Sequence, residues 1–427
     1  MITELTITNY KSALKTHVPL SRFNVLIGEN GAGKSNILES LALASAAGAN
    51  KLDTEYLSAR GVRLCTSRLT KSAFNSSTQK KPITIFVKTD LPDEDGRGRE
   101  YEFILHHDDK ANTQWQLDLR SKVPLPTPME DLMRSWEANK ADPSAKAATE
   151  ELRKLMKFLR QEFHRTESIK KSKSNSAAKD LNGVTITLRN PLVASLITGF
   201  IQKSTFERFT VYSPNYDTLK NHLAVPATSP IGPKGEGMLA TIQSMQEDEP
   251  ARFKDITESL KLFDWYSSIR FPTENQTRND GLSSRIAIGD RYVRTRGLLL
   301  DDSAVNEGFL YVLFYLTIFC SSKTPAIFGI ENIDTALNPR LCEVLVKQLI
   351  SLSKKYEKQV IVTTHNPAIL DGLNLDDSSQ SLLIVRRNAD GHTLVDNYQK
   401  PQITSEKHIR LSEAFMRGHI GALPKGI

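Results

Sequence analysis

The chain has 427 residues, of which 39% are hydrophobic and 25% are charged, and its formal net charge at pH 7 is +7. This composition excludes collagen-like and wholly disordered classes and leaves room for one large domain or two average ones. The positive excess is mild, so it permits contact with DNA without requiring it.

The cysteines, the first residues and the apolar content of the chain indicate in which cellular compartment the protein is expected. The three cysteines, Cys65, Cys320 and Cys342, are far apart, and their spacing suits neither a disulfide framework nor a zinc site. Residues 1–4 carry no basic region before a long apolar stretch, so no signal peptide is expected. The most apolar window, residues 309–319, is too short to span a bilayer. We therefore expect a cytoplasmic protein that makes no membrane contact.

The first 125 residues read as strand, loop, helix and further strands. An apolar run at Phe23–Ile27 ends at a glycine-rich loop, and a helical pattern follows the loop. Additional strands are predicted at Ile83–Lys88, Tyr101–Leu105 and Trp115–Leu119. We take residues 1–125 as an N-terminal lobe.

A lysine-rich segment follows the prolines at 124–126. Residues 128–181 favour helix, with an apolar stripe at Leu152, Leu155, Met156, Leu159 and Phe163. Basic residues surround this stripe, so the segment could contact DNA or a partner, or be a solvated helix face. We interpret residues 126–190 as an inserted basic helical arm and residues 191–427 as the C-terminal lobe.

The C-terminal lobe alternates strands and helices. The predicted elements are a strand at 209–212, a helix at 306–320, a strand at 326–330, a helix at 339–356, and strands at 360–364 and 382–386. A C-terminal helical tail follows them. This alternation predicts an α/β fold with a mixed, largely parallel sheet.

The strongest motif is Gly28–Ser35, which fits G-x-x-x-x-G-K-[ST] fully. Its backbone N–H groups can surround a phosphate, and the following helix points its positive end at that phosphate. Lys34 is expected to reach the β- and γ-phosphates of ATP, and Ser35 to ligate Mg²⁺. The nucleotide contacts expected from this stretch are Gly28, Asn30, Gly31, Ala32, Gly33, Lys34, Ser35 and Asn36.

The second motif is an apolar strand at 326–330 that ends in polar residues. The stretch from Ala326 to Pro339 resembles the Walker B motif and D-loop of SMC-like and RecF-like ABC-type ATPases. The resemblance gives Glu331 the position of the Mg²⁺-associated acid and Asn332 that of the catalytic glutamate. Asn338 then takes the last position of the D-loop. A register slipped by one residue would instead make Glu331 the catalytic glutamate.

Both acidic positions depart from the family pattern. A glutamate at 331 keeps the charge on a longer arm, whereas an amide at 332 cannot accept a proton from water. Three alternatives follow. ATP is hydrolysed slowly, or Asp334 replaces the missing base, or bound ATP holds two subunits together without being hydrolysed.

Two further stretches resemble the same family. The strand end Thr363–Pro367 resembles the switch-histidine loop, which implies that His365 contacts the γ-phosphate. Asn306 and Gly308 stand where the family has its signature motif at a helix start, which implies contact with ATP bound to a second subunit. Near the N-terminus, Lys11 could lie beside the nucleotide base. Gln79 is a candidate for the Q-loop glutamine.

The resemblance implies a homodimer or higher oligomer that closes around ATP. The tail at 411–424 resembles those of small bacterial ATPases paired with a nuclease in phage defence, and it fits a packed terminal helix with a glycine stop equally well. The first hypothesis is therefore an SMC-like ATPase that regulates an effector, a nuclease, in anti-phage defence. The alternative is a RecF-like ATPase that binds DNA during repair. A transport ATPase is disfavoured because no LSGGQ run occurs, and no nuclease-like carboxylate set is found in the chain.

Overall fold

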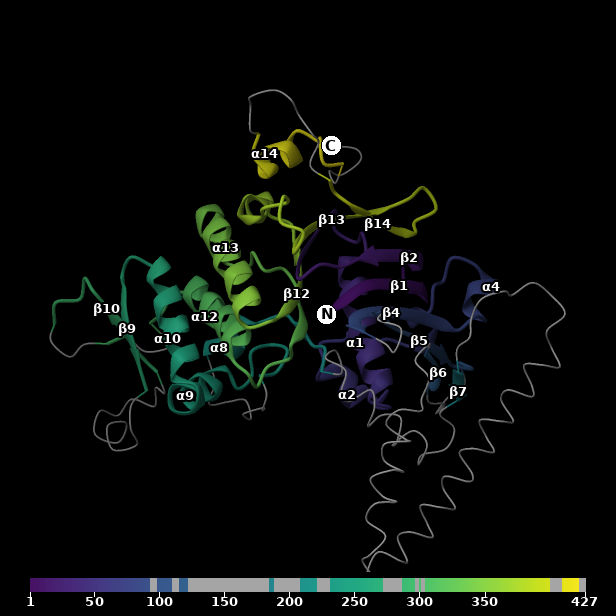
Figure 1. Cartoon of the computed structure of the whole chain (residues 1–427), viewed down its shortest axis with the longest axis horizontal. Coiled ribbons are helices and arrows are strands. Elements are labelled where there is room, and N and C mark those ends of the chain that lie inside the picture. Colours follow the sequence, from purple (N-terminus) through teal and green to yellow (C-terminus); the bar gives the residue numbers. More distant parts are fainter. Residues whose placement is uncertain are drawn as a thin grey trace, which may run out of the picture.

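The fold is layered as sheet, helix, sheet and outer helices. The computed structural model describes residues 1–92, 98–109, 115–121, 184–187, 208–220, 231–271, 286–295, 299–300, 304–399 and 409–421. Helix α1 (Lys34–Gly48) lies between two six-stranded sheets, and a group of helices covers the other face of the second sheet (Figure 1).

The first sheet is antiparallel throughout. In spatial order its strands are β2 (Ala13–Pro19), β1 (Ile2–Tyr10), β4 (Ile83–Pro92), β5 (Gly98–His106), β6 (Gln116–Ser121) and β7 (Val184–Thr187). The apolar residues of β1 alternate toward α1, the pattern of a strand with one buried face. Strand β7 extends this sheet, so the first lobe resumes before the predicted boundary at 190. The predicted helical arm at 128–181 lies outside the described residues.

The second sheet is mostly parallel. In spatial order its strands are β14 (Thr393–Asn397), β13 (Gln380–Arg387), β3 (Phe23–Ile27), β12 (Gln359–Thr364), β11 (Ile327–Ile330) and β8 (Val211–Tyr212). Every neighbouring pair is parallel except β13 with β14. Strand β3 therefore lies in the middle of the sheet, between strands from the C-terminal part of the chain.

Long helices pack on the outer face of the second sheet. They are α9 (Met238–Asp248), α10 (Pro250–Ser259), α12 (Glu307–Cys320) and α13 (Pro339–Lys355). The shorter elements are α2 (Thr54–Ser58), α3 (Ser67–Thr70), α4 (Ser76–Gln79), α8 (Tyr216–Lys220), η2 (Leu260–Leu262), η3 (Pro367–Gly372), α14 (Leu411–Met416) and the hairpin of β9 (Tyr266–Arg270) with β10 (Ala287–Asp290).

Two hydrophobic cores hold the layers together. On β3, Phe23, Val25 and Ile27 face the outer helices, whereas Leu26 faces α1. Strands apolar on both faces are typical of a parallel sheet covered by helices. Helix α12 is buried all round from Phe309 to Cys320. Among the described residues, no helix combines the length and apolar character needed to cross a membrane.

The predicted fold class, an α/β head with a mixed, largely parallel sheet, is confirmed. The predicted strands and helices of the C-terminal lobe are present within a few residues of their expected bounds. The prediction missed β2, β14, the β9–β10 hairpin, α9 and α10. The strands among them are short or lack clear alternation, and α9 and α10 have few buried apolar residues from which a helical stripe could be recognised.

Two adjacent polar side chains fix the start of β12. The amide of Gln359 donates to the carbonyls of Ile2 and Ser21 and accepts from the N–H of Ile2 at 2.7 Å, which joins the two sheets. The ammonium of Lys358 donates to the carbonyls of Ser321, Thr324 and Pro325 at 2.9–3.1 Å. Burial lowers the pKa of Lys358 to about 8. Lys358 thereby anchors the turn between α12 and β11.

We predict that Lys358→Met changes the pH dependence of stability. The folded pKa of about 8 is below the ordinary value of 10.5, so the unfolded chain binds more protons between these values. The contribution of Lys358 to stability therefore rises with pH in that window, by about 2 kcal/mol from pH 7.5 to 9.5. Urea unfolding of wild type and Lys358→Met at both pH values measures the difference. The prediction is contradicted if the difference in free energy of unfolding between the two proteins is the same at pH 7.5 and pH 9.5.

Candidate functional site

The phosphate-binding loop connects β3 to α1. Gly31 and Gly33 have φ of 78° and 108°, a region that favours glycine. The ammonium of Lys34 donates to the carbonyls of Gly28 at 2.7 Å and Glu29 at 2.9 Å. The first turn of α1 therefore presents its N–H groups and Lys34 to the same space, the arrangement that binds phosphate.

The β13–β14 hairpin packs against the loop at two glycines. A Cβ added to Gly28 would lie 1.9 Å from the carbonyl oxygen of Val385. A Cβ added to Gly33 would lie 2.2 Å from Oγ1 of Thr393. Both contacts are far below van der Waals distance, so the hairpin requires glycine at both positions. Gly31 faces open space and is required only for its backbone conformation.

Ser35 and Glu331 are hydrogen-bonded although 296 residues separate them in sequence. Glu331 follows the last residue of β11, and its N–H donates to the carbonyl of Tyr212 at 2.8 Å. A hydroxyl and a carboxylate are ligands that Mg²⁺ accepts, with phosphate oxygens and water completing its shell. These two side chains therefore fit a Mg²⁺–nucleotide complex. Among the described residues, no group of three or more His, Cys, Asp or Glu side chains gathers as a metal site.

Asn332 and Asp334 follow Glu331 and have different surroundings. Asn332 is exposed and has φ of 51°, and its N–H donates to the hydroxyl of Thr363 at 2.9 Å. Asp334 accepts a hydrogen bond from the hydroxyl of Thr364 at 2.6 Å. The negative charge of Asp334 acts on both Lys34 and His365. After Glu331, Asp334 is therefore the next carboxylate whose charge acts on Lys34.

His365 follows β12, the neighbour of β3 in the sheet. Burial lowers the pKa of His365, the nearby Lys34 ammonium lowers it further, and Asp334 acts in the opposite direction. The imidazole is therefore neutral at pH 7 and can donate one hydrogen bond and accept another. Burial also lowers the pKa of Lys34 to about 8, against the opposing effects of Asp334 and Glu331.

Asn306 and Asn338 are the N-caps of α12 and α13. The side-chain oxygen of Asn306 accepts from the N–H of Phe309 at 2.8 Å, and that of Asn338 accepts from Leu341 at 2.9 Å. Both asparagines are exposed. A Cβ on Gly308 would lie 3.0 Å from the carbonyl oxygen of Ala336. The start of α12 therefore lies directly on the loop that precedes α13.

Three further candidates from the sequence, Asn36, Gln79 and Lys11, make hydrogen bonds or ion pairs within the fold. The amide of Asn36 donates to the hydroxyl of Ser12, in the turn between β1 and β2, at 2.7 Å. The amide of Gln79 donates to the carbonyls of Arg68 and Ser72, so it holds a short turn. Lys11 forms an ion pair with the buried Glu39 of α1.

Sequence reasoning missed two groups near the site. Arg63 pairs with Glu39 at 2.5 Å, and its guanidinium interacts electrostatically with Glu331. Asn215 follows β8, the neighbour of β11, and caps α8 by accepting from Asp217. A polar residue after an apolar strand was the available signal for Asn215. The ion pair of Arg63 has no signature in the sequence.

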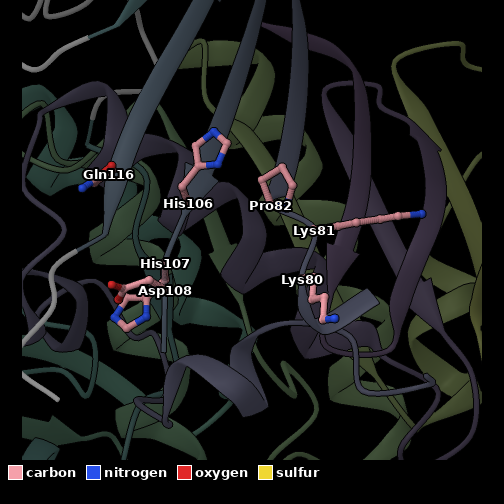
Figure 2. A pocket seen from close by; sticks show the side chains of 7 residues that line it. All are labelled: Lys80, Lys81, Pro82, His106, His107, Asp108 and Gln116. Atoms are coloured by element: carbon pink, nitrogen blue, oxygen red, sulfur yellow. The ribbon is translucent and has the colours of Figure 1, made fainter. Parts of the chain in front are cut away.

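A surface cavity of about 200 Å³ lies in the antiparallel lobe, apart from these motifs. Figure 2 shows its lining side chains, Lys80, Lys81, Pro82, His106, His107, Asp108 and Gln116. His106 pairs with Asp118 at 3.3 Å, and Lys81 extends away from His107 and Asp108 (Figure 2). Because these polar groups do not converge on a common point, we assign no site to the cavity.

The family assignment agrees with this geometry. A family model described as "AAA ATPase domain" matches residues 1–278, about two thirds of the chain. The chain belongs to this AAA ATPase domain family. A second model, described as "AAA domain, putative AbiEii toxin, Type IV TA system", matches residues 249–371. None of the curated proteins matches the chain.

Solved structures of SMC heads resemble this AAA ATPase. An SMC head bound to the C-winged helix domain of ScpA is 14% identical, with a TM-score of 0.54 over 93% of this chain and 98% of that one. The SMC head domain of Thermotoga maritima (12% identity, TM-score 0.45) covers 93% of this chain and 99% of its own. An Smc head from Pyrococcus furiosus, bound to the C-terminal domain of ScpA, is 14% identical with a TM-score of 0.47. The similarity covers 93% of this chain and 96% of that one. The first similarity shows the fold of an SMC-like, ABC-type ATPase head, as predicted.

We predict that Gly33→Ala destabilises this ATPase head more than Gly31→Ala. Both substitutions put a side chain at positive φ, which costs about 1–2 kcal/mol. Only the Cβ at position 33 meets Thr393, which adds about 1–3 kcal/mol of overpacking. Thermal unfolding of the nucleotide-free variants measures the difference. Equal losses for the two variants would show that the hairpin yields to the added methyl group.

Proposed function

We propose that the chain binds Mg²⁺–ATP between the phosphate-binding loop and the carboxyl end of β11. The observation that carries this proposal is the hydrogen bond between Ser35 and Glu331, beside the buried ammonium of Lys34. Lys34 would contact the β- and γ-phosphates, and Ser35 with Glu331 would hold the metal. Mg²⁺ supplies charge neutralisation at the phosphates.

The same residues point to slow hydrolysis. Asn332 stands where the family has its catalytic glutamate, and an amide does not take a proton from the attacking water. Asp334 is the nearby carboxylate, and its partner Thr364 already donates to it. His365, neutral at pH 7, would sense the γ-phosphate by a hydrogen bond. We therefore propose that bound ATP mainly holds a conformation.

A second copy of the chain would complete the site. At the start of α12, Asn306 is exposed and Gly308 is half-buried, and this end of the helix is its positive end, which suits a partner's γ-phosphate. We propose a head dimer that closes around ATP and controls a partner protein, a nuclease in phage defence. Support comes from the tail resemblance, from the toxin-family description of the second matching model, and from the ScpA-bound SMC heads.

We predict opposite effects of two substitutions on ATP turnover. Glu331→Gln removes the metal-binding carboxylate and is expected to reduce turnover by on the order of 100-fold and to weaken its Mg²⁺ dependence. Asn332→Glu supplies a base and is expected to raise turnover on the order of 10- to 100-fold. Steady-state phosphate release measures both, with Lys34→Ala as the inactive control. If Asn332→Glu has no effect while Glu331→Gln abolishes turnover, the slipped register holds and Glu331 is the catalytic glutamate.

We also predict that the partner protein binds this chain only when ATP is bound. The tagged full chain, expressed with its genomic neighbours, is expected to retain a nuclease in the presence of ATP and to lose it with Lys34→Ala. DNA binding by the isolated chain that weakens steeply with salt, without any protein partner, would instead favour the repair ATPase.

A further inference from the structure

Thr393, the first residue of β14, lies fully buried behind the phosphate-binding loop. Its N–H donates to the carbonyl of Ser12 at 2.8 Å, and its carbonyl accepts from the hydroxyl of Thr16 at 2.7 Å. Its hydroxyl donates to the carbonyl of Ala32, inside the loop, at 2.8 Å. The backbone of Thr393 is thus fixed by the β1–β2 hairpin, while its side chain reaches the loop.

The hydrogen-bond partners determine the direction of a chain of four groups. The single hydroxyl proton of Thr393 is used toward Ala32, so the contact of 2.7 Å with Ser12 requires the Ser12 hydroxyl to donate. Ser12 in turn accepts from the amide of Asn36 at 2.7 Å. The chain runs from Asn36 through Ser12 and Thr393 to Ala32, and each hydroxyl both donates and accepts. Such chains polarise their members and are stronger than separate bonds.

Both ends of this chain belong to the loop and the first turn of α1. Ala32 and Asn36 flank Gly33, Lys34 and Ser35, the residues expected to meet phosphate and metal. The two inner members come from the β1–β2 turn and from the C-terminal hairpin. The chain therefore closes a brace across the loop from outside the motif. The close approach of Thr393 to Gly33 belongs to the same contact.

We propose that Thr393 is a positioning residue for nucleotide binding, which holds the phosphate-binding loop in its binding conformation through Ala32 and Ser12. This inference rests on the proposed binding of Mg²⁺–ATP at that loop. The preformed loop binds phosphate without first ordering its backbone, so loss of the brace lowers affinity rather than the rate of any later step. Through Thr393, the start of β14 thereby supports the ATP site from behind the loop.

Thr393→Val tests the hydroxyl, because valine keeps the shape and branching of threonine. It leaves the carbonyl of Ala32 without its donor and the proton of the Ser12 hydroxyl without its acceptor. The dissociation constant for Mg²⁺–ATP is expected to rise about tenfold, with turnover at saturating ATP unchanged. Thr393→Ser retains the hydroxyl and is expected to bind within about twofold of wild type. Isothermal titration of the full chain and phosphate release measure the two quantities.

Ser381→Ala is the matched control. Ser381 is a buried hydroxyl on the same hairpin, and it donates to Asn24 at the opposite end of β3 at 2.7 Å. Its loss is expected to lower the unfolding temperature without changing ATP affinity. The inference is overturned if Thr393→Val binds like wild type, or if Ser381→Ala weakens binding equally.

The remaining outcomes separate the inference from the proposed function. If Thr393→Val does not fold, Ser12→Ala breaks the same chain one member earlier and is held to the same tenfold expectation. If wild type does not bind Mg²⁺–ATP, the proposed function fails. If wild type binds and Lys34→Ala does not, an unaffected Thr393→Val removes only the role of Thr393.

Discussion

The site depends on the central place of β3 in the second sheet. Strand β3 lies between β12 and β13, and all three run parallel, so their carboxyl ends meet at one edge. The loop after β3 therefore meets His365 after β12 and Val385 near the end of β13. Glu331 joins from β11, one strand further. A fragment that ended before β11 would keep the motif and lose the groups that the C-terminal strands bring to the loop.

The charges around the loop fit the proposal that ATP is held more than it is consumed. Lys34 faces two carboxylates, Glu331 and Asp334, and a third carboxylate at 332 would stand beside the γ-phosphate. Repulsion between unit charges about 4 Å apart near a protein surface is on the order of 4 kcal/mol. If residue 332 holds the catalytic position, its amide would remove both that repulsion and the general base. On the proposed function, this one residue would both stabilise bound ATP and slow its hydrolysis.

The sequence predicts the groups that act within one segment better than those that act between segments. Gly28–Ser35 and the strand before Glu331 were recognisable because a motif and an apolar run stand next to each other. Strand β14 was missed, and with it Thr393, because its contact to Ala32 spans 361 positions and leaves no local pattern. The Glu39–Arg63 pair was missed for the same reason. Gly33 was found as part of a motif, but the contact that excludes a side chain there, with the Thr393 hydroxyl, appears only in the tertiary structure.

The two asparagine caps explain how this surface can serve a neighbouring subunit without a serine. In Asn306 and Asn338 the side-chain oxygen is used to cap the helix, which leaves the exposed amide N–H groups as donors. An asparagine can thus stabilise its own helix and bind a phosphate of another subunit at once. The contact of Gly308 with the Ala336 carbonyl joins this surface to the loop that begins at Glu331. A shift of that loop when ATP is lost would therefore also move the start of α12, which would couple the proposed metal site to the proposed dimer surface.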